Sequence, residues 1–178
     1  MLRIVLLTLL FAAPLFAQDS AQDALEAAGC GPNDVHFTVK TDKKQHPTAQ
    51  PEAGKALVYV IGDTDGDHAV AAVGVAPARF GVDGTWVGAN GLRSYFFFPV
   101  DPGDHRLCTN LQFRSQGRVK SSTTARSFTA EAGQSYYFRT VTPLGGPSGL
   151  TTKLVEVDPA EAQVLIAAAA YSTFKVKK

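Results

Sequence analysis

Three aspartates with alternate spacing are the first residues whose type and position could do chemistry. Asp63, Asp65 and Asp67 lie in the segment DTDGDH, and calcium loops place side-chain oxygens at alternate positions in the same way. An EF-hand would also need a glycine directly after the third acid and a glutamate at the twelfth position. Here Gly66 precedes Asp67, and Gly74 stands at the twelfth position. We therefore expect a solvated turn between strands, with Ca²⁺ binding as the alternative.

The histidines and hydroxyl residues form no recognisable catalytic group. None of the four histidines stands at a zinc-ligand spacing from a cysteine or from another histidine. His105 follows a turn and shares the inward parity of Leu107, which predicts a hydrogen-bonded structural histidine. No nucleophile-elbow sequence supports a Ser-His-Asp triad. The sequence favours a protein that is not an enzyme, and a hydrolase is its weakest alternative.

Several aromatic side chains could form a binding surface. A groove for carbohydrate or peptide needs such rings, although aromatic residues in strands more often serve packing. Trp86 follows a two-residue turn and could project from an exposed rim, so Trp86 and Tyr95 are the predicted ligand contacts. The other candidates for such a groove are Tyr59, Tyr136 and Tyr137.

Residues 1–17 have the pattern of a secretory signal peptide. A basic start, an apolar run over residues 4–13 and a small residue at Ala17 precede the polar Gln18. The run is too short for a membrane anchor, which needs about 20 apolar residues. A lipid-bearing cysteine would have to follow the cleavage point, where Gln18 stands instead. We expect a soluble product, secreted or periplasmic, without a membrane span after cleavage.

Charge and length restrict the remaining possibilities. The chain has 17 basic and 16 acidic residues, a net charge of +1, so no overall field favours nucleic acid. The expected partner is an unknown protein or another component of the cell envelope. The mature chain of about 160 residues is long enough for one domain. We expect an N-terminal segment over residues 18–33 and a single domain over residues 34–178.

Two cysteines in an exported protein predict one disulfide. In the segment 105–113, Leu107, Leu111 and Phe113 share one parity, and Cys108 has the other. Cys108 should therefore face away from the main core. A bridge to Cys30 would fasten the N-terminal segment onto the sheet, and two unpaired cysteines are the alternative.

The segment 79–113 organises the rest of the chain. Asp83-Gly84 between apolar residues predicts a two-residue hairpin, because both central residues of such a turn need positive φ. The apolar run 94–100 predicts a strand that ends at a Pro-Gly turn, and residues 105–113 predict its return strand. Residues 55–62 are apolar on both faces, which is typical of a central strand.

The C-terminal part changes to a helical period. Asp158, Pro159 and Glu161 give an N-cap, a proline at the first helical position and an acid three residues after the cap. We expect a helix over residues 159–172 with most of its surface covered. Tyr95 and Phe97 face away from Phe96 and Phe98, so a two-layer fold buries one set and the helix can cover the other.

These elements together predict a mainly β fold. Further strands are expected at residues 35–39, 69–75, 119–129, 135–141 and 150–157. The predicted architecture is an antiparallel β-sandwich, Ig-like or prealbumin-like, of about seven to nine strands with one C-terminal helix.

The turn residues also carry a resemblance to a known family. Val82-Asp83-Gly84, Val87-Gly88 and Pro102-Gly103-Asp104-His105 resemble the hairpin of PEGA-type surface domains. Over residues 55–157 the chain resembles a bacterial family of secreted proteins and lipoproteins that consists of domains of unknown function. The resemblance implies a small β-sandwich and assigns no catalytic residue. The predicted function is a binding or structural role, and the alternative is an accessory module that binds carbohydrate or peptide.

Overall fold

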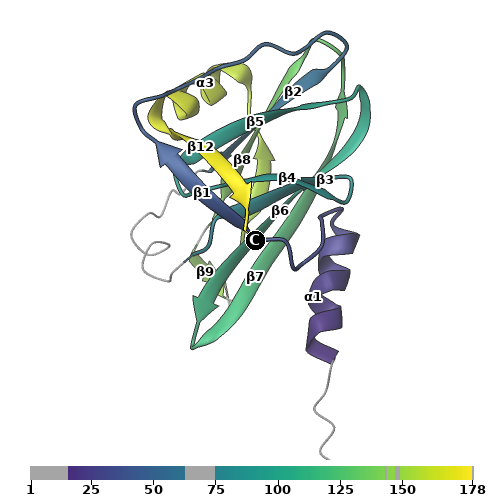
Figure 1. Cartoon of the computed structure of the whole chain (residues 1–178), viewed down its shortest axis with the longest axis vertical. Helices are drawn as coiled ribbons and strands as arrows, with labels where there is room; N and C mark the ends of the chain where they lie inside the picture. Colours follow the sequence, from purple (N-terminus) through teal and green to yellow (C-terminus); the bar gives the residue numbers. More distant parts are fainter. Residues whose placement is uncertain (1–15, 63–74, 143, 147–148, 178) are drawn as a thin grey trace, which may run out of the picture.

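In the part of the chain that the structure describes, the protein folds into two packed β-sheets with two short helices (Figure 1). The computed structural model describes residues 16–62, 75–142, 144–146 and 149–177. Within these residues ten strands form the two main sheets, and a small hairpin pairs β9 (Leu144–Gly146) with β10 (Gly149–Leu150). The prediction of a mainly β fold is confirmed, whereas the number of strands exceeds the expected seven to nine.

The larger sheet has six strands and is mixed. Its central strand β2 is buried along its whole length, as the apolar segment predicted. β2 runs parallel to β8, and β12 runs parallel to β5. The expectation of a purely antiparallel fold is wrong for this sheet. In spatial order it contains β1 (Phe37–Asp42), β12 (Ala170–Val176), β5 (Ser94–Val100), β2 (Ala56–Gly62), β8 (Ser135–Val141) and β11 (Lys153–Glu156).

The smaller sheet is antiparallel and contains the predicted hairpin. Asp83 and Gly84 have φ values of 50° and 85°, and they join β3 to β4 as a two-residue turn requires. β7, which covers the strand expected at residues 119–129, lies at the edge of this sheet. The order is β4 (Thr85–Asn90), β3 (Ala78–Val82), β6 (Gly103–Ser115) and β7 (Arg118–Ala130).

The predicted return strand does not pair with the strand before it. β5 belongs to the six-stranded sheet, whereas β6 pairs with β3 and β7 in the other sheet. The turn at Asp101 and Pro102 therefore carries the chain from one layer to the other. A turn sequence specifies a change of direction, but it does not specify which neighbour the next strand will take.

The main core lies between the sheets. Val58, Val60 and Phe96 from the larger sheet pack against Phe80 and Leu107 from the smaller one. The outer face of the larger sheet forms a second core under α3 (Pro159–Ala168). The predicted division of β5 is confirmed, because alternate residues of this strand enter the two cores.

The C-terminal helix begins as predicted and ends early. Asp158 accepts hydrogen bonds from the backbone N–H groups of Ala160 and Glu161, with Pro159 at the first helical position. The helix ends at Ala168, and Tyr171 belongs to β12, a strand that the sequence did not predict. In α3 only Ala162 and Ile166 are buried, and Val164 is 71% exposed. The expectation that most of the helix would be covered is wrong, because one contact with a sheet needs only one buried stripe.

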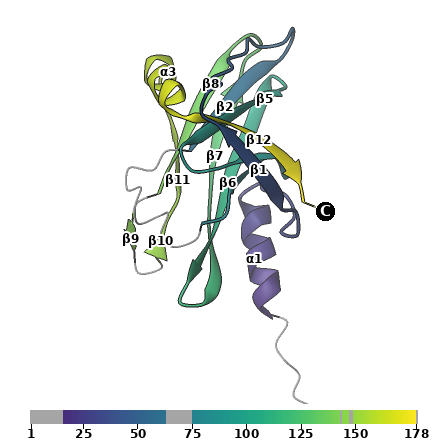
Figure 2. The ribbon, with the colours of Figure 1, turned by 60° about the vertical axis from the view of Figure 1, so that its left-hand side comes forward.

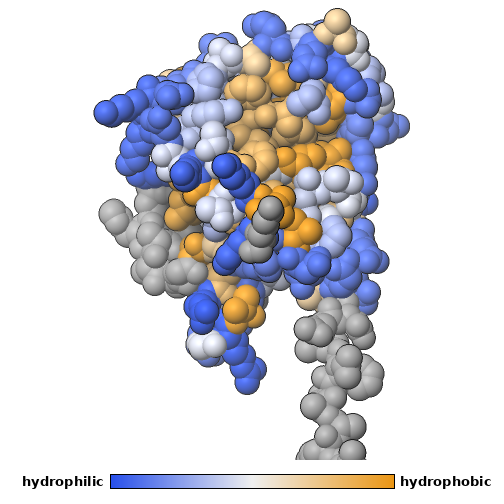
Figure 3. Space-filling model, viewed as in Figure 1, coloured by the Kyte–Doolittle hydropathy of each residue, from blue (hydrophilic) through white to orange (hydrophobic). Residues whose placement is uncertain are grey.

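The second helix, α1 (Phe16–Ala27), lies at the opposite end of the molecule from α3 (Figure 2). It spans the predicted cleavage point after Ala17. The long β6–β7 hairpin reaches past the other strands, toward the same end of the molecule as α1. In the space-filling view, apolar residues gather in the middle of the visible face and hydrophilic residues lie along its margins (Figure 3).

Candidate functional site

The candidate ligand site in the described part of the chain is a groove beside α3. It lies between residues 46–50, α3 and the outer face of β2 and β8, and its volume is about 410 Å³. We call it the tyrosine groove because Tyr59 and Tyr137 line it. Its polar side chains are His46, Thr48, Gln50, Ser135 and Gln163.

Two stacked rings form the floor of the tyrosine groove. The ring centroids of Tyr59 and Tyr137 are 5.0 Å apart at an interplanar angle of 23°. They come together because β2 and β8 are parallel neighbours in which these residues are directly paired. Tyr59 is almost fully buried, whereas Tyr137 is half-buried. Tyr137 is thus the ring that a ligand can reach.

Tyrosine hydroxyls hold the loop that forms one wall. The hydroxyl of Tyr59 accepts a hydrogen bond from Ala49 N at 2.9 Å and donates one to Ala49 O at 3.1 Å. His46 Nδ1 donates to Ile166 O of α3 at 3.3 Å. Burial raises the pKa of Tyr59, so its hydroxyl stays protonated and available as a donor. The wall is therefore fixed before any ligand arrives.

Tyr95, one of the two predicted ligand contacts, also holds the loop that forms this wall. It is fully buried, and its hydroxyl donates to Pro47 O at 2.9 Å. Burial, with smaller contributions from nearby tyrosines, raises its pKa to about 12. The structure places Tyr95 in the packing under the loop and not on a surface that a ligand can contact.

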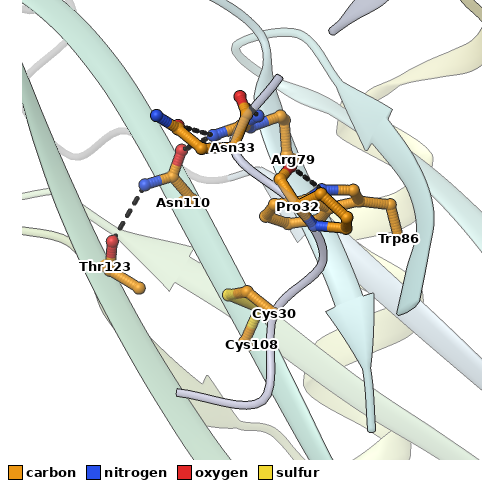
Figure 4. Close-up of a disulfide and its surroundings, with 8 residues drawn as sticks. All are labelled: Cys30, Pro32, Asn33, Arg79, Trp86, Cys108, Asn110 and Thr123. Carbon is orange, nitrogen blue, oxygen red and sulfur yellow. Dashed lines mark hydrogen bonds between the residues drawn. A yellow bond between two sulfur atoms is a disulfide. The ribbon is translucent and has the colours of Figure 1, made fainter. Parts of the chain in front are cut away.

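Trp86, the other predicted contact, belongs to β4 of the smaller sheet, whereas the tyrosine groove lies on the larger one. Its side chain packs against the N-terminal segment (Figure 4). Its indole Nε1 donates to Pro32 O at 2.7 Å. A Cβ on Gly31 would overlap the indole ring, so this glycine permits the close approach. Trp86 is half-buried, and the structure brings it together with neither Tyr95 nor the tyrosine groove.

The predicted disulfide joins the same segment to β6. Cys30 and Cys108 are bonded, with Cα atoms 5.6 Å apart. Cys108 lies outside the main core, in a small cluster with Leu25 and the flank of Trp86, which confirms the parity argument. The bridge indicates an oxidising, extracytoplasmic compartment. Within the described residues, no helix is long and apolar enough to cross a bilayer.

A buried arginine beside Trp86 was not predicted from the sequence. Arg79 is 3% exposed, and its guanidinium lies 4.5 Å from the centre of the Trp86 ring. It donates to Asn110 Oδ1 at 2.6 Å, to Val35 O at 2.6 Å and to Asn33 O at 3.0 Å. Asn110 in turn donates to Thr123 at 2.9 Å. Burial lowers the pKa of Arg79, and its contacts tie the N-terminal segment to β3 and β6.

His105 has the structural role that the sequence predicted. Its Nδ1 lies 2.7 Å from Asp83 Oδ2, and its Nε2 lies 2.7 Å from Asp101 O. Both partners are acceptors, so both nitrogens donate when the ring is protonated. Partial burial by itself would lower the pKa of His105, but the bonds to Asp83 and Asp101 outweigh it and raise the pKa. With both nitrogens donating, the ring has no free lone pair to act as a general base.

The three residues of the predicted calcium site, Asp63, Asp65 and Asp67, lie outside the described residues. Among the residues that are described, no group of three or more His, Cys, Asp or Glu side chains could hold a metal ion.

Compared with protein-family models, curated proteins and solved structures, the chain gives no match.

Proposed function

We propose that this protein is an exported, non-enzymatic binding protein that holds a neutral carbohydrate in the tyrosine groove. The observation that carries the proposal is the half-buried ring of Tyr137 at the floor of a preformed hollow. Sugars present apolar C–H faces that pack on aromatic rings, and their hydroxyl groups need short polar partners at the margin. The groove supplies both.

The chemistry of the lining favours a neutral ligand. Apart from His46, the polar groups that face the groove are amides and hydroxyls, among them Gln50, Ser135 and Gln163. Amides and hydroxyls donate and accept hydrogen bonds without requiring a counter-charge. A charged ligand would lose hydration in this groove without gaining an ionic partner. A peptide is the alternative ligand, since its backbone could use the same amides.

Export is the second part of the proposal. The Cys30–Cys108 bridge supports it independently of the N-terminal sequence pattern, because such bridges persist outside the reducing cytoplasm. We infer a secreted or periplasmic location for the mature chain.

The test is direct binding to arrayed neutral oligosaccharides and arrayed peptides, followed by calorimetry with the best ligand. We expect an oligosaccharide to bind and Tyr137→Ala to weaken it about tenfold, as the loss of one stacking ring does. Gln163→Ala should also weaken binding. Val164→Ala is the matched control, because Val164 is exposed on the same helix and does not line the groove.

Two results would overturn the proposal. If peptides bind and every oligosaccharide fails, the ligand class is wrong. If an oligosaccharide binds equally to the wild type and to the folded Tyr137→Ala variant, the ligand lies elsewhere.

A further inference from the structure

The β1–β12 ribbon carries lysines on the face that points away from the core. β1 and β12 are antiparallel, and residues paired across such strands share a face. Val39 is paired with Phe174, whose ring lies 5.0 Å from that of the core residue Phe96. These residues therefore point inward. Their neighbours Lys40 and Lys175 point outward, and so does Lys177, whose N–H continues the pairing by donating to His36 O.

We call Lys40, Lys175 and Lys177 the lysine face. Residues two apart on a strand are separated by about 7 Å, and diagonal neighbours by about 7–8 Å. By this geometry Lys175 lies next to both of the other lysines. Lys43 and Lys44 follow directly after β1 and add two further cations at one end. Asp42, at the same end, uses its carboxylate to accept from Lys44 N.

These lysines are not neutralised by the fold. All five are exposed, and none forms an ion pair with any described residue. Other cations do find partners: Lys55 contacts Asp101 at 2.6 Å, and Arg126 contacts Glu156 at 3.0 Å. Since the whole chain carries a net charge of only +1, attraction of a polyanion depends on local groups of cations such as this one.

We propose that the lysine face binds a linear anionic polysaccharide. Charge complementarity requires an anion with several charges, because three ammonium groups stand in a row along an extended ribbon. The hydroxyls of Thr38 and Thr173 alternate with the lysines. A hollow of about 150 Å³ is lined by Lys40, Lys175 and these two threonines, together with Phe174. Hydroxyl groups beside cations suit a sugar backbone that carries acidic substituents.

The lysine face fits an anionic membrane less well than it fits an anionic polysaccharide. The ribbon residues Lys40, Thr38, Thr173, Lys175 and Lys177 offer no apolar group to insert among acyl chains. The exposed Val176 belongs to the opposite face by its pairing with Phe37. The inference does not rest on the tyrosine groove, which is lined by uncharged side chains and by His46.

The test measures binding of the full chain to polygalacturonate and dextran sulfate, with uncharged dextran as the reference and phosphatidylglycerol vesicles as the competing surface. We expect both polyanions to bind, with an affinity that falls as salt rises. The variant Lys40→Gln, Lys175→Gln, Lys177→Gln should bind about tenfold more weakly or worse. Unchanged thermal unfolding of this variant will show that it is folded.

The matched control removes three cations from another place. Arg114, Arg118 and Lys120 are near the tip of the β6–β7 hairpin, and replacing all three by Gln changes the net charge by the same amount. This variant should keep the affinity of the wild type. Equal losses in the two variants would overturn the proposal, since net charge alone would then explain binding. Failure of both polyanions at physiological salt, or binding only to the vesicles, would also overturn it.

Discussion

The contacts of His105 make its charge part of the fold. A neutral imidazole has one donor and one acceptor nitrogen, but Asp83 and the backbone at Asp101 both present oxygens to it. Partial burial would raise the pKa of Asp83, yet the hydrogen bonds from His105 and from Arg106 N outweigh it and lower the pKa. The arrangement is therefore most stable with a protonated histidine and an ionised aspartate.

The pKa directions predict how this site responds to pH. The pKa of His105 is raised in the folded state, so protonated His105 adds to the free energy of unfolding. This contribution is complete below the unfolded pKa of about 6.5 and is lost as pH rises through the folded pKa. The contribution of Asp83, whose pKa is lowered, is present above about pH 3.8 and is lost as pH falls through the folded pKa. We expect His105→Gln to lower the free energy of unfolding more at pH 5.5 than at pH 9. The difference should be about 0.5–1 kcal/mol, since the pair is partly exposed.

Urea unfolding of both proteins across this pH range measures the effect. Asp83→Asn provides the control, because asparagine tolerates the positive φ of this turn and removes the charge. In the Asp83→Asn background, most of the pH-dependent part of the His105→Gln effect should disappear. A stability difference that stays constant from pH 5.5 to pH 9 would contradict the assigned role of His105.

Among the elements, α3 shows how one helix can be both necessary and half exposed. Ile166 is 6% exposed and packs in the outer core, whereas Val164 on the same helix is 71% exposed. We expect Ile166→Ala to lower the free energy of unfolding by about 2–4 kcal/mol, through lost burial and an unfilled space. Val164→Ala should change it by less than about 0.5 kcal/mol.

Denaturant unfolding of the two variants tests this assignment. If both variants unfold at the denaturant concentration of the wild type, α3 does not contribute to the stability of the sheet beneath it. If Val164→Ala is the more damaging change, the assigned buried face of the helix is wrong.

Elements that depend on local chemistry could be predicted from the sequence, and elements that depend on distant pairing could not. The Asp83-Gly84 turn and the Asp158 cap are specified by residues next to each other, and both are confirmed. β12 was missed because the alanine-rich run before it continues into Ala170 and Tyr171 without a break in polarity. Its place between β1 and β5 depends on partners more than 70 residues away.

The same reasoning explains the partial prediction of the sites. Parity places Cys108 away from the main core. Parity does not reveal that α3 and the 46–50 loop cover the face of Tyr95, so the prediction of Tyr95 as a ligand contact lacked this information. Tyr137 could be recognised as aromatic, while its position beside Tyr59 requires the parallel pairing of β2 and β8. Arg79 gave no signal, since its acceptors are mostly backbone and amide oxygens from segments far along the chain.

At the scale of the molecule, the N-terminal segment works as a cover for the smaller sheet. It is attached by the disulfide, by the hydrogen bond from Trp86 to Pro32 and by the Arg79 contacts with Asn33 and Val35. Leu25 of α1 is 2% exposed in the same cluster. The polar attachments persist without the covalent bond, so its loss should weaken the fold without changing the arrangement.

The final prediction concerns the cross-link itself. Cys30 and Cys108 are 78 residues apart, and closing a loop of this size restricts the unfolded chain by about 4–5 kcal/mol in the chain-entropy model. Measured bridges often contribute less, so we expect reduction to lower the free energy of unfolding by about 2–5 kcal/mol. Comparing oxidised and reduced wild type keeps every side chain in place, whereas Cys30→Ala with Cys108→Ala also removes two buried sulfur atoms.

Mass spectrometry without reductant establishes the starting state, and denaturant unfolding with and without reductant gives the difference. The reduced protein should keep its circular dichroism spectrum, because Arg79 and Trp86 still hold the segment by their hydrogen bonds. Two free thiols in the purified protein, or identical unfolding midpoints in the two redox states, would show that the bridge does not fasten the N-terminal segment to the sheet.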